Sequence, residues 1–225
     1  MEKRKILITN FGQENNFPIF FGKGVNSLLY VPFAVPEKSR DAYMTEVRGD
    51  EFLRKYKISS VHEVDNPERA VEDAQAIVIG GGNTHLLLKE MYDTNIVDLI
   101  REKVQNGMPI VGKSAGAGVL CPTIKTSNDW AIVDAPSLDA VNVVPFQINP
   151  HFPEFGTPGY QPRANKIGEF HTVCDTPVLG LIDGASLFVQ GDSAILYGLK
   201  GAELFLQGEL GREVKPKSRL DFLFE

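Results

Sequence analysis

The strongest local signal in the sequence is the segment Pro109-Ile-Val-Gly-Lys-Ser-Ala-Gly-Ala-Gly118, which joins an apolar strand to a helix through a serine flanked by glycines. The pattern Gly112-x-Ser114-x-Gly116 in a strand–turn–helix context is typical of a strained turn that carries a nucleophilic serine. Both glycines are needed because a β-carbon there would collide with the neighbouring strand or helix. The pattern predicts an exposed Ser114 hydroxyl at the sheet edge and an Ala115 N–H directed at an oxyanion. A phosphate-binding turn or a simple packing turn is the alternative.

Apolar, β-branched runs alternate with helical patterns through the first two thirds of the chain. Strands are expected at Lys5–Thr9, Leu28–Phe33, Ile58–Val64, Ala76–Ile79 and Pro109–Gly112, and helices at Glu37–Tyr56, Pro67–Ala74, Thr84–Tyr92 and Ile96–Val104. This alternation predicts an α/β fold whose mostly parallel sheet is flanked by helices on both faces.

The last third of the chain has a different pattern, in which short strands are separated by turn dipeptides. The strands are expected at Val178–Asp183, Ser186–Val189, Ala194–Tyr197 and Glu203–Leu206. Asp-Gly, Gly-Asp and Lys-Gly turns between them predict C-terminal antiparallel hairpins appended to the parallel sheet.

Composition limits the class of protein. With 225 residues, 43% of them hydrophobic and 23% charged, the chain is not mainly disordered, and we expect a single α/β domain over residues 1–225. The 29 acidic and 23 basic residues give a net charge of -6, which argues against nucleic-acid binding and against an anionic membrane surface. An acidic substrate would therefore need a local cation.

Two cysteines, Cys121 and Cys174, are too few for a disulfide framework or a structural zinc site, and they favour a reducing compartment. The N-terminal apolar run is too short for a signal peptide, and no stretch approaches the roughly 20 apolar residues of a membrane span. We expect a cytoplasmic protein. The sequence has no HExxH motif, no His/Cys cluster and no calcium loop, so we expect no metal and no cofactor.

A second glycine turn, Gly80-Gly-Gly-Asn-Thr84, follows the strand that ends at Ile79. Asn83 or Thr84 is suited to cap the next helix, and backbone N–H groups in such a turn can face an anion or an oxyanion. The segment matches neither the dinucleotide fingerprint nor the P-loop. A backbone donor opposite Ser114 and a tight turn without a ligand are the two interpretations that remain.

A nucleophilic serine needs a base, and His151 is the best placed of four histidines. It follows the expected strand Val143–Pro150, so its imidazole lies at the end of that strand; a loop histidine without a role is the alternative. Asp129 and Asp183 are both candidates for the acid that orients the imidazole, although each also fits a turn. The other histidines are expected in ordinary structural positions, with His62 facing water, His85 in a first helical turn and His171 near a helix end.

Taken together and in this order, these segments resemble peptidase E, the α-aspartyl dipeptidase family of serine peptidases. The resemblance covers most of residues 5 to about 200, and it rests on Gly80–Thr84, Gly112–Gly116, Cys121–Asp129, Gln147–Phe152, Arg163–Glu169 and Gly180–Gly184. It implies a fold similar to the class I glutamine amidotransferases.

The resemblance also implies site residues. Ser114 would be the nucleophile and His151 the base, while the acid would be Asp129 or Asp183, the latter at a position where some relatives carry Glu. The N–H groups of Gly82 and Ala115 would form the oxyanion hole.

For substrate binding, the resemblance implies Arg163, and Lys113 is a second candidate cation. Lys113 stands where relatives have an aromatic residue, and Pro162 where they have a hydroxyl residue.

The expected activity is hydrolysis of Asp-X dipeptides through an acyl-enzyme, so the partner is a small acidic dipeptide; the oligomeric state stays open. The alternatives are a cyanophycinase-like or isoaspartyl serine hydrolase of the same fold, and a non-catalytic, amidotransferase-like binding protein.

Overall fold

A computed structural model describes residues 4–225 and contains two sheets, the larger of which is mostly parallel. This seven-stranded sheet has the order β3 (Lys57–Ser60), β2 (Ser27–Val31), β4 (Ile77–Ile79), β5 (Pro109–Lys113), β1 (Lys5–Thr9), β8 (Ala185–Gln190) and β9 (Ser193–Gly198). The first five strands pair in parallel, and β8 and β9 extend the sheet antiparallel to β1. The predicted α/β class is confirmed.

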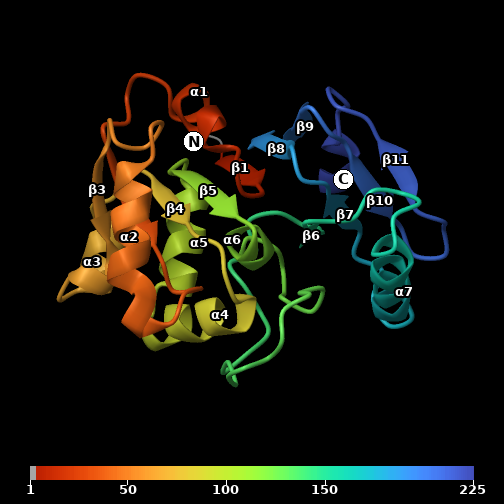
Figure 1. Cartoon of the computed structure of the whole chain (residues 1–225), viewed down its shortest axis with the longest axis horizontal. Helices are drawn as coiled ribbons and strands as arrows, with labels where there is room; N and C mark the ends of the chain where they lie inside the picture. The colour runs from red at the N-terminus through yellow and green to blue at the C-terminus, as the bar shows by residue number, and fades with distance from the viewer. Residues whose placement is uncertain (1–3) are drawn as a thin grey trace.

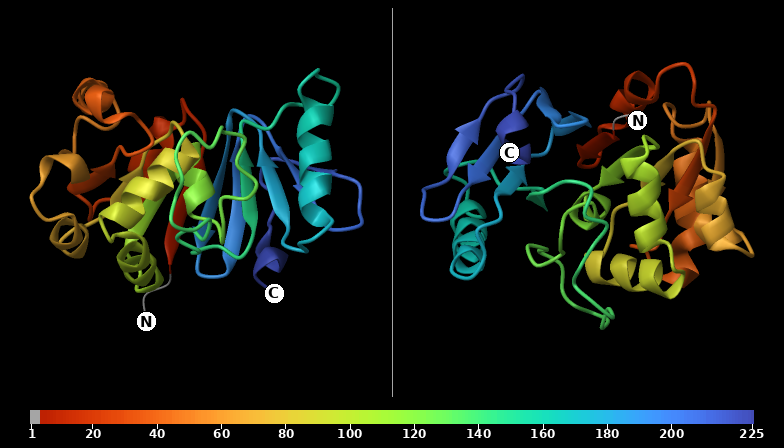
Figure 2. Two further views of the ribbon diagram at one scale, coloured as in Figure 1. Left: turned by 90° about the horizontal axis from the view of Figure 1, so that it is seen from below. Right: turned by 180° about the vertical axis from the view of Figure 1, so that it is seen from behind.

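Helices cover both faces of this sheet, as the alternation of strands and helices predicts (Figure 1, Figure 2). Ile6 and Ile8 of β1 belong to one apolar cluster, whereas Leu7 between them belongs to the cluster on the other face. The first face carries α3 (Pro67–Glu72), α4 (Thr84–Asp93), α5 (Val97–Gln105) and α6 (Ala115–Val119), and the second carries α1 (Phe17–Phe21) and α2 (Arg40–Gly49). Short 3-10 turns lie at Glu14–Asn16, Glu37–Ser39, Val61–Glu63 and Asp221–Phe224.

The smaller sheet lies beside the larger one and is mixed (Figure 1). Its order is β11 (Arg212–Val214), β10 (Ala202–Phe205), β7 (Val178–Leu181) and β6 (Gln147–Pro150). β6 and β7 run parallel, and the other pairs run antiparallel. Helix α7 (Tyr160–His171) contributes Ile167 to a small cluster with Phe152 and Phe205.

Several expected elements differ from the observed ones, and one of them is the strand expected over Val143–Pro150, which begins only at Gln147. Only β8 and β9 form a hairpin on the main sheet, because β7 and β10 pair with each other in the smaller sheet. The helix expected over Glu37–Tyr56 ends at Gly49, where the carboxylate of Asp50 accepts the next backbone N–H groups and stops the helix in a turn. The strand expected over Ile58–Val64 ends at Ser60, where a 3-10 turn begins.

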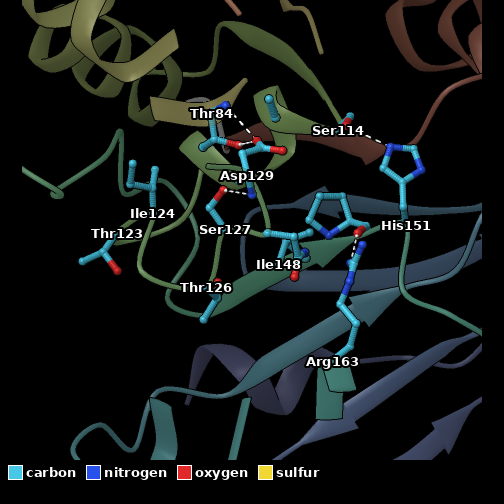
Figure 3. A pocket seen from close by; sticks show the side chains of 14 residues that line it. Thr84, Ser114, Thr123, Ile124, Thr126, Ser127, Asp129, Ile148, His151 and Arg163 are labelled. Carbon is cyan, nitrogen blue, oxygen red and sulfur yellow. Dashed lines mark hydrogen bonds between the residues drawn. The ribbon is translucent and has the colours of Figure 1, made fainter. Parts of the chain in front are cut away.

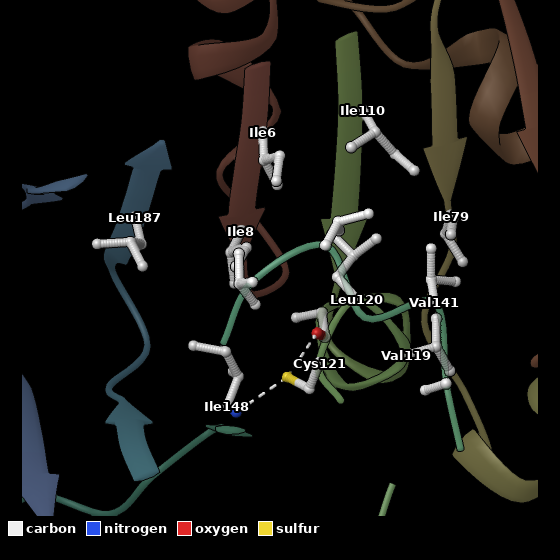
Figure 4. Close-up of a cluster of buried hydrophobic side chains, with 14 of the residues drawn as sticks. Ile6, Ile8, Ile79, Ile110, Val119, Leu120, Cys121, Val141, Ile148 and Leu187 are labelled. Carbon is white, nitrogen blue, oxygen red and sulfur yellow. Dashed lines mark hydrogen bonds between the residues drawn. The ribbon is translucent and has the colours of Figure 1, made fainter. Parts of the chain in front are cut away.

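The buried side chain of Cys121 links helix α6 to strand β6. The Cys121 thiol accepts the N–H of Ile148 in β6 at 3.1 Å and donates to the Ala117 carbonyl of α6 at 3.5 Å (Figure 4). Burial raises the pKa of this thiol to about 12, so it stays neutral and unreactive. These contacts fix α6, which follows β5, to β6, which leads into His151.

None of the helices within residues 4–225 combines the length and the apolar character needed to cross a bilayer.

Candidate active site

Ser114 lies in a strained turn between β5 and α6. Its φ of 53° and ψ of -110° are unusual for a residue with a side chain, and its carbonyl accepts the N–H groups of Ala117 and Gly118 that begin the helix. A β-carbon on Gly116 would lie 2.2 Å from the Ile79 carbonyl oxygen. The close approach of α6 to β4 therefore requires glycine there, which explains the sequence pattern.

His151 follows β6 and faces Ser114. The Ser114 Oγ lies 2.9 Å from His151 Nε2 (Figure 3). His151 also has a left-handed backbone, with φ of 53°. Its N–H is held at 3.4 Å by the side-chain oxygen of Asn10, whose amide donates to the Leu181 carbonyl at 2.9 Å. Buried Asn10 thus ties the histidine to the end of β7, a role that the sequence analysis missed.

Asp183 is the acid that the structure brings to the imidazole. Its Oδ1 lies 2.6 Å from His151 Nδ1. A carboxylate can only accept here, so Nδ1 carries the proton and Nε2 is left to accept from Ser114. The contact follows from parallel pairing of β6 and β7, which sets Pro150 opposite Leu181 and brings together the residues beyond both ends. The aspartate side chain, shorter than glutamate, spans the distance.

Asp129, the other candidate acid, is bonded elsewhere. Its Oδ2 accepts the N–H of Thr84 at 2.8 Å and the Thr84 hydroxyl at 2.5 Å, at the start of α4. Asp129 still lines the pocket in front of Ser114 and so belongs to the same site. The structure places it on the pocket wall and gives it no hydrogen bond to His151.

Arg163 lies in the first turn of α7 and lines the same pocket. Its Nη1 donates to the Asn149 side-chain oxygen at 2.8 Å. The same Nη1 donates to the Pro150 carbonyl at 2.9 Å (Figure 3). Burial lowers the pKa of the guanidinium, while the charges of Asp129 and Asp183 act to raise it. Within residues 4–225, Nε and Nη2 donate to no partner, so an edge of the fork is available for an anion.

The two glycine turns meet beside Ser114. A β-carbon on Gly81 would lie 3.1 Å from the Ser114 Cβ, and one on Gly82, whose φ is +141°, would lie 2.3 Å from the Ala34 carbonyl oxygen. The N–H groups of Gly82 and Ala115 make no hydrogen bond within the described residues, and Ala115 is a pocket residue. Both groups are therefore available to an oxyanion, as the oxyanion-hole prediction requires.

Phe11 is a further site residue that the sequence analysis missed. It is 49% exposed and stacks on His151, with ring centroids 5.4 Å apart and an interplanar angle of 23°. Its ring would also contact any side chain on Gly81. A signal was available: Phe11 comes just after β1, which pairs in parallel with β5 and ends at the same sheet edge.

Lys113 does not line the pocket, contrary to its candidacy as the substrate cation. Lys113 is the last residue of β5, whereas Ser114 lies in the strained turn that follows the strand. The ammonium pairs with Glu14, lies 5.2 Å from the ring centre of Phe11, and is nearly buried. Lys113 therefore contacts the Phe11 ring and does not face the substrate pocket.

The remaining histidines lie outside the pocket. His62, expected to face water, is largely covered and bonds Ser60 and Asp41 through its two ring nitrogens. In the described part of the chain, Asp41, His62 and Glu63 form a group that could hold a metal ion, but Glu63 already pairs with Arg48. None of these residues lines the pocket.

Comparison with known proteins places the chain among peptidases. The model of peptidase family S51 matches residues 9–197. The chain is 37% identical over 237 aligned positions to a peptidase E from Nostoc sp., with 100% of this chain and 98% of that protein covered. It is 42% identical over 173 positions to a peptidase E from a Shewanella species, covering 76% and 73% of the two chains. The crystal structure of a peptidase from an acI-B1 Actinobacterium has the same fold, with a TM-score of 0.71, 18% identity and 97% of each chain covered. The chain belongs to peptidase family S51, the peptidase E family of serine peptidases.

Proposed function

We propose that this serine peptidase hydrolyses dipeptides with an N-terminal aspartate, with Ser114 as nucleophile, His151 as base and Asp183 as the acid that orients the histidine. The observation that supports this assignment is the chain of hydrogen bonds from Ser114 Oγ through the imidazole to the Asp183 carboxylate, at 2.9 and 2.6 Å. Membership of the peptidase E family gives the dipeptide substrates.

Acylation begins when Ser114 Oγ attacks the carbonyl carbon of the aspartyl residue and His151 Nε2 takes the hydroxyl proton. The carbonyl oxygen becomes an oxyanion, which accepts the N–H groups of Gly82 and Ala115; each such donor is worth about 3 kcal/mol in other enzymes. When the C–N bond breaks, His151 gives the proton to the leaving amine. The second amino acid departs, and the aspartyl group remains as an ester on Ser114.

Deacylation repeats the same steps with water. His151 takes a proton from the water as its oxygen attacks the ester carbon, and it returns the proton to Ser114 Oγ as the ester bond breaks. The product is free aspartate. Asp183 stabilises the imidazolium that forms in each half of the reaction.

Arg163 is the proposed partner of the substrate's side-chain carboxylate. The protein's net charge of -6 repels an acidic dipeptide, so selectivity must come from a local cation. A guanidinium remains charged even where burial lowers its pKa, and its planar fork matches a carboxylate. Replacing Arg163 by methionine should lower kcat/KM for Asp-Leu by roughly 100-fold or more and leave folding intact.

Both sheets supply residues to this machinery, Ser114 from the larger sheet, and His151 and Asp183 from the ends of strands in the smaller one. We therefore propose that residues 1–225 act as one hydrolytic domain. The two cysteines, neither in a disulfide, favour the cytoplasm as the place where it acts.

The test is a panel of Asp-X, Glu-X, Asn-X and β-Asp-X dipeptides offered to the wild type and to Ser114→Ala. We expect cleavage of Asp-X by the wild type and a loss of roughly 10⁴-fold in kcat for the variant. Preferred cleavage of β-Asp-X would assign an isoaspartyl hydrolase instead. Cleavage of no aspartyl dipeptide, or full activity without the Ser114 hydroxyl, would overturn the proposal.

A further inference from the structure

The carboxylate of Asp129 has an unused oxygen in the pocket. Its Oδ2 is engaged by the N–H and the hydroxyl of Thr84. No hydrogen bond within residues 4–225 reaches Oδ1, which points away from Thr84 in Figure 3. Because Asp129 lines the pocket together with Ser114 and Arg163, an anionic acceptor is presented to whatever binds in front of the nucleophile.

The pocket therefore carries one cation and one anion that do not neutralise each other by contact. Arg163 uses Nη1 on Asn149 and Pro150, and no ion pair joins it to Asp129 in the described part of the chain. Two fixed, opposite charges around a nucleophile favour a ligand that carries both charges in the complementary order.

An N-terminal aspartyl residue is such a ligand, since its α-ammonium and its side-chain carboxylate flank the carbonyl that Ser114 attacks. We propose that Asp129 Oδ1 binds the α-ammonium group of the substrate while Arg163 binds the carboxylate. The inference rests on the proposed function and makes Asp129 the residue that restricts hydrolysis to a free N-terminus. It also separates Asp129 from the catalytic triad.

Two chromogenic substrates test this role, because they differ only in the ammonium group. One is aspartyl p-nitroanilide, and the other is the mono-p-nitroanilide of succinic acid, in which hydrogen replaces the ammonium. Asp129→Asn should lower kcat/KM for the first by roughly 10- to 100-fold, the loss of one charge-assisted contact. Hydrolysis of the second should stay within about threefold of the wild type, since it has no ammonium to lose.

The variant is suited to the test because an asparagine oxygen still accepts the Thr84 N–H and preserves the start of α4. The matched control is Asp134→Asn, which makes the same charge change on an exposed residue that does not line the pocket. It should alter neither substrate's hydrolysis. Equal losses on both substrates in Asp129→Asn would overturn the inference and return Asp129 to the triad, whose members act on every substrate.

A binding measurement separates this inference from the proposed activity. By calorimetry, Ser114→Ala should bind L-aspartate more tightly than succinate, and adding Asp129→Asn should abolish that preference. If the preference depends on Asp129 although the wild type cleaves no aspartyl substrate, the inference stands and the proposed function fails. If the wild type cleaves aspartyl substrates and the double variant keeps the preference, the function stands and the inference is overturned.

Discussion

Replacing Asp183 by asparagine removes the only carboxylate that contacts the His151 imidazole among the described residues. The carboxylate accepts from Nδ1 and so leaves Nε2 free of a proton, ready to accept from Ser114. An asparagine amide can donate to Nδ1 instead, which favours the tautomer with the proton on Nε2. In that tautomer His151 cannot act as a base toward Ser114.

The expected loss of kcat/KM depends on how exposed Asp183 and His151 are. A buried triad aspartate is worth about 10⁴-fold in rate. The Asp183 side chain is 67% exposed and the His151 side chain 29% exposed. Water therefore weakens the Asp183 charge and hydrates the imidazolium, and the contribution should be smaller than at a buried site. We expect Asp183→Asn to lower kcat/KM by roughly 10²- to 10³-fold.

The assay is steady-state hydrolysis of Asp-Leu, with the rate of fluorophosphonate labelling of Ser114 as a second readout. Asp183→Glu is the matched control, since it keeps the carboxylate and the exposed position has room for a longer side chain; it should stay within about tenfold of the wild type. Both variants should melt within a few degrees of the wild type. Wild-type kcat/KM in Asp183→Asn would refute the assigned role.

Three other perturbations test the scaffold around the site. Gly116→Ala puts a β-carbon 2.2 Å from the Ile79 carbonyl oxygen and should lower the free energy of unfolding by about 3 kcal/mol. The control is Gly118→Ala, whose β-carbon would lie 3.7 Å from Thr84 Cγ2; it should be neutral or stabilising in urea titrations. Equal losses would contradict the close packing. Glu14→Gln leaves the Lys113 charge nearly buried and unpaired, at a cost of about 3 kcal/mol or more, and adding Lys113→Met should restore most of it; no recovery would refute the pairing. In the native protein, iodoacetamide should modify Cys174 and spare Cys121, whose burial raises its pKa to about 12; peptide mass analysis measures both. Equal labelling of the two cysteines would contradict the burial of Cys121.

Local patterns were sufficient to predict much of the main sheet and the turn at Ser114. Strand β1 (Lys5–Thr9) was predicted with its observed bounds, because a buried parallel strand is a continuous apolar run. The turn was predictable because close packing of α6 on β4 leaves no room for a β-carbon at Gly116. The position therefore requires glycine, and this glycine is visible in the sequence.

The choice between Asp129 and Asp183 depended on a contact that no local pattern encodes. Asp183 meets His151 because β6 and β7 pair in parallel, whereas the sequence predicted β7 as part of a hairpin. Pairing between distant strands is decided by packing of the whole core and not by residue preferences. The position of Phe11 just after β1 places it at the same sheet edge as Ser114, but its stacking on His151 joins residues 140 positions apart (151 minus 11) and is not encoded locally.

The most direct test of the account is to identify the residue that becomes acylated. The wild type, mixed with the p-nitrophenyl ester of aspartate and quenched in acid within the first turnover, should gain the mass of one aspartyl group on the peptide that contains Ser114. His151→Ala should accumulate little of this adduct, and Ser114→Ala none. An adduct on another residue, or rapid hydrolysis of Asp-Leu by Ser114→Ala, would contradict the claim that this serine is the nucleophile.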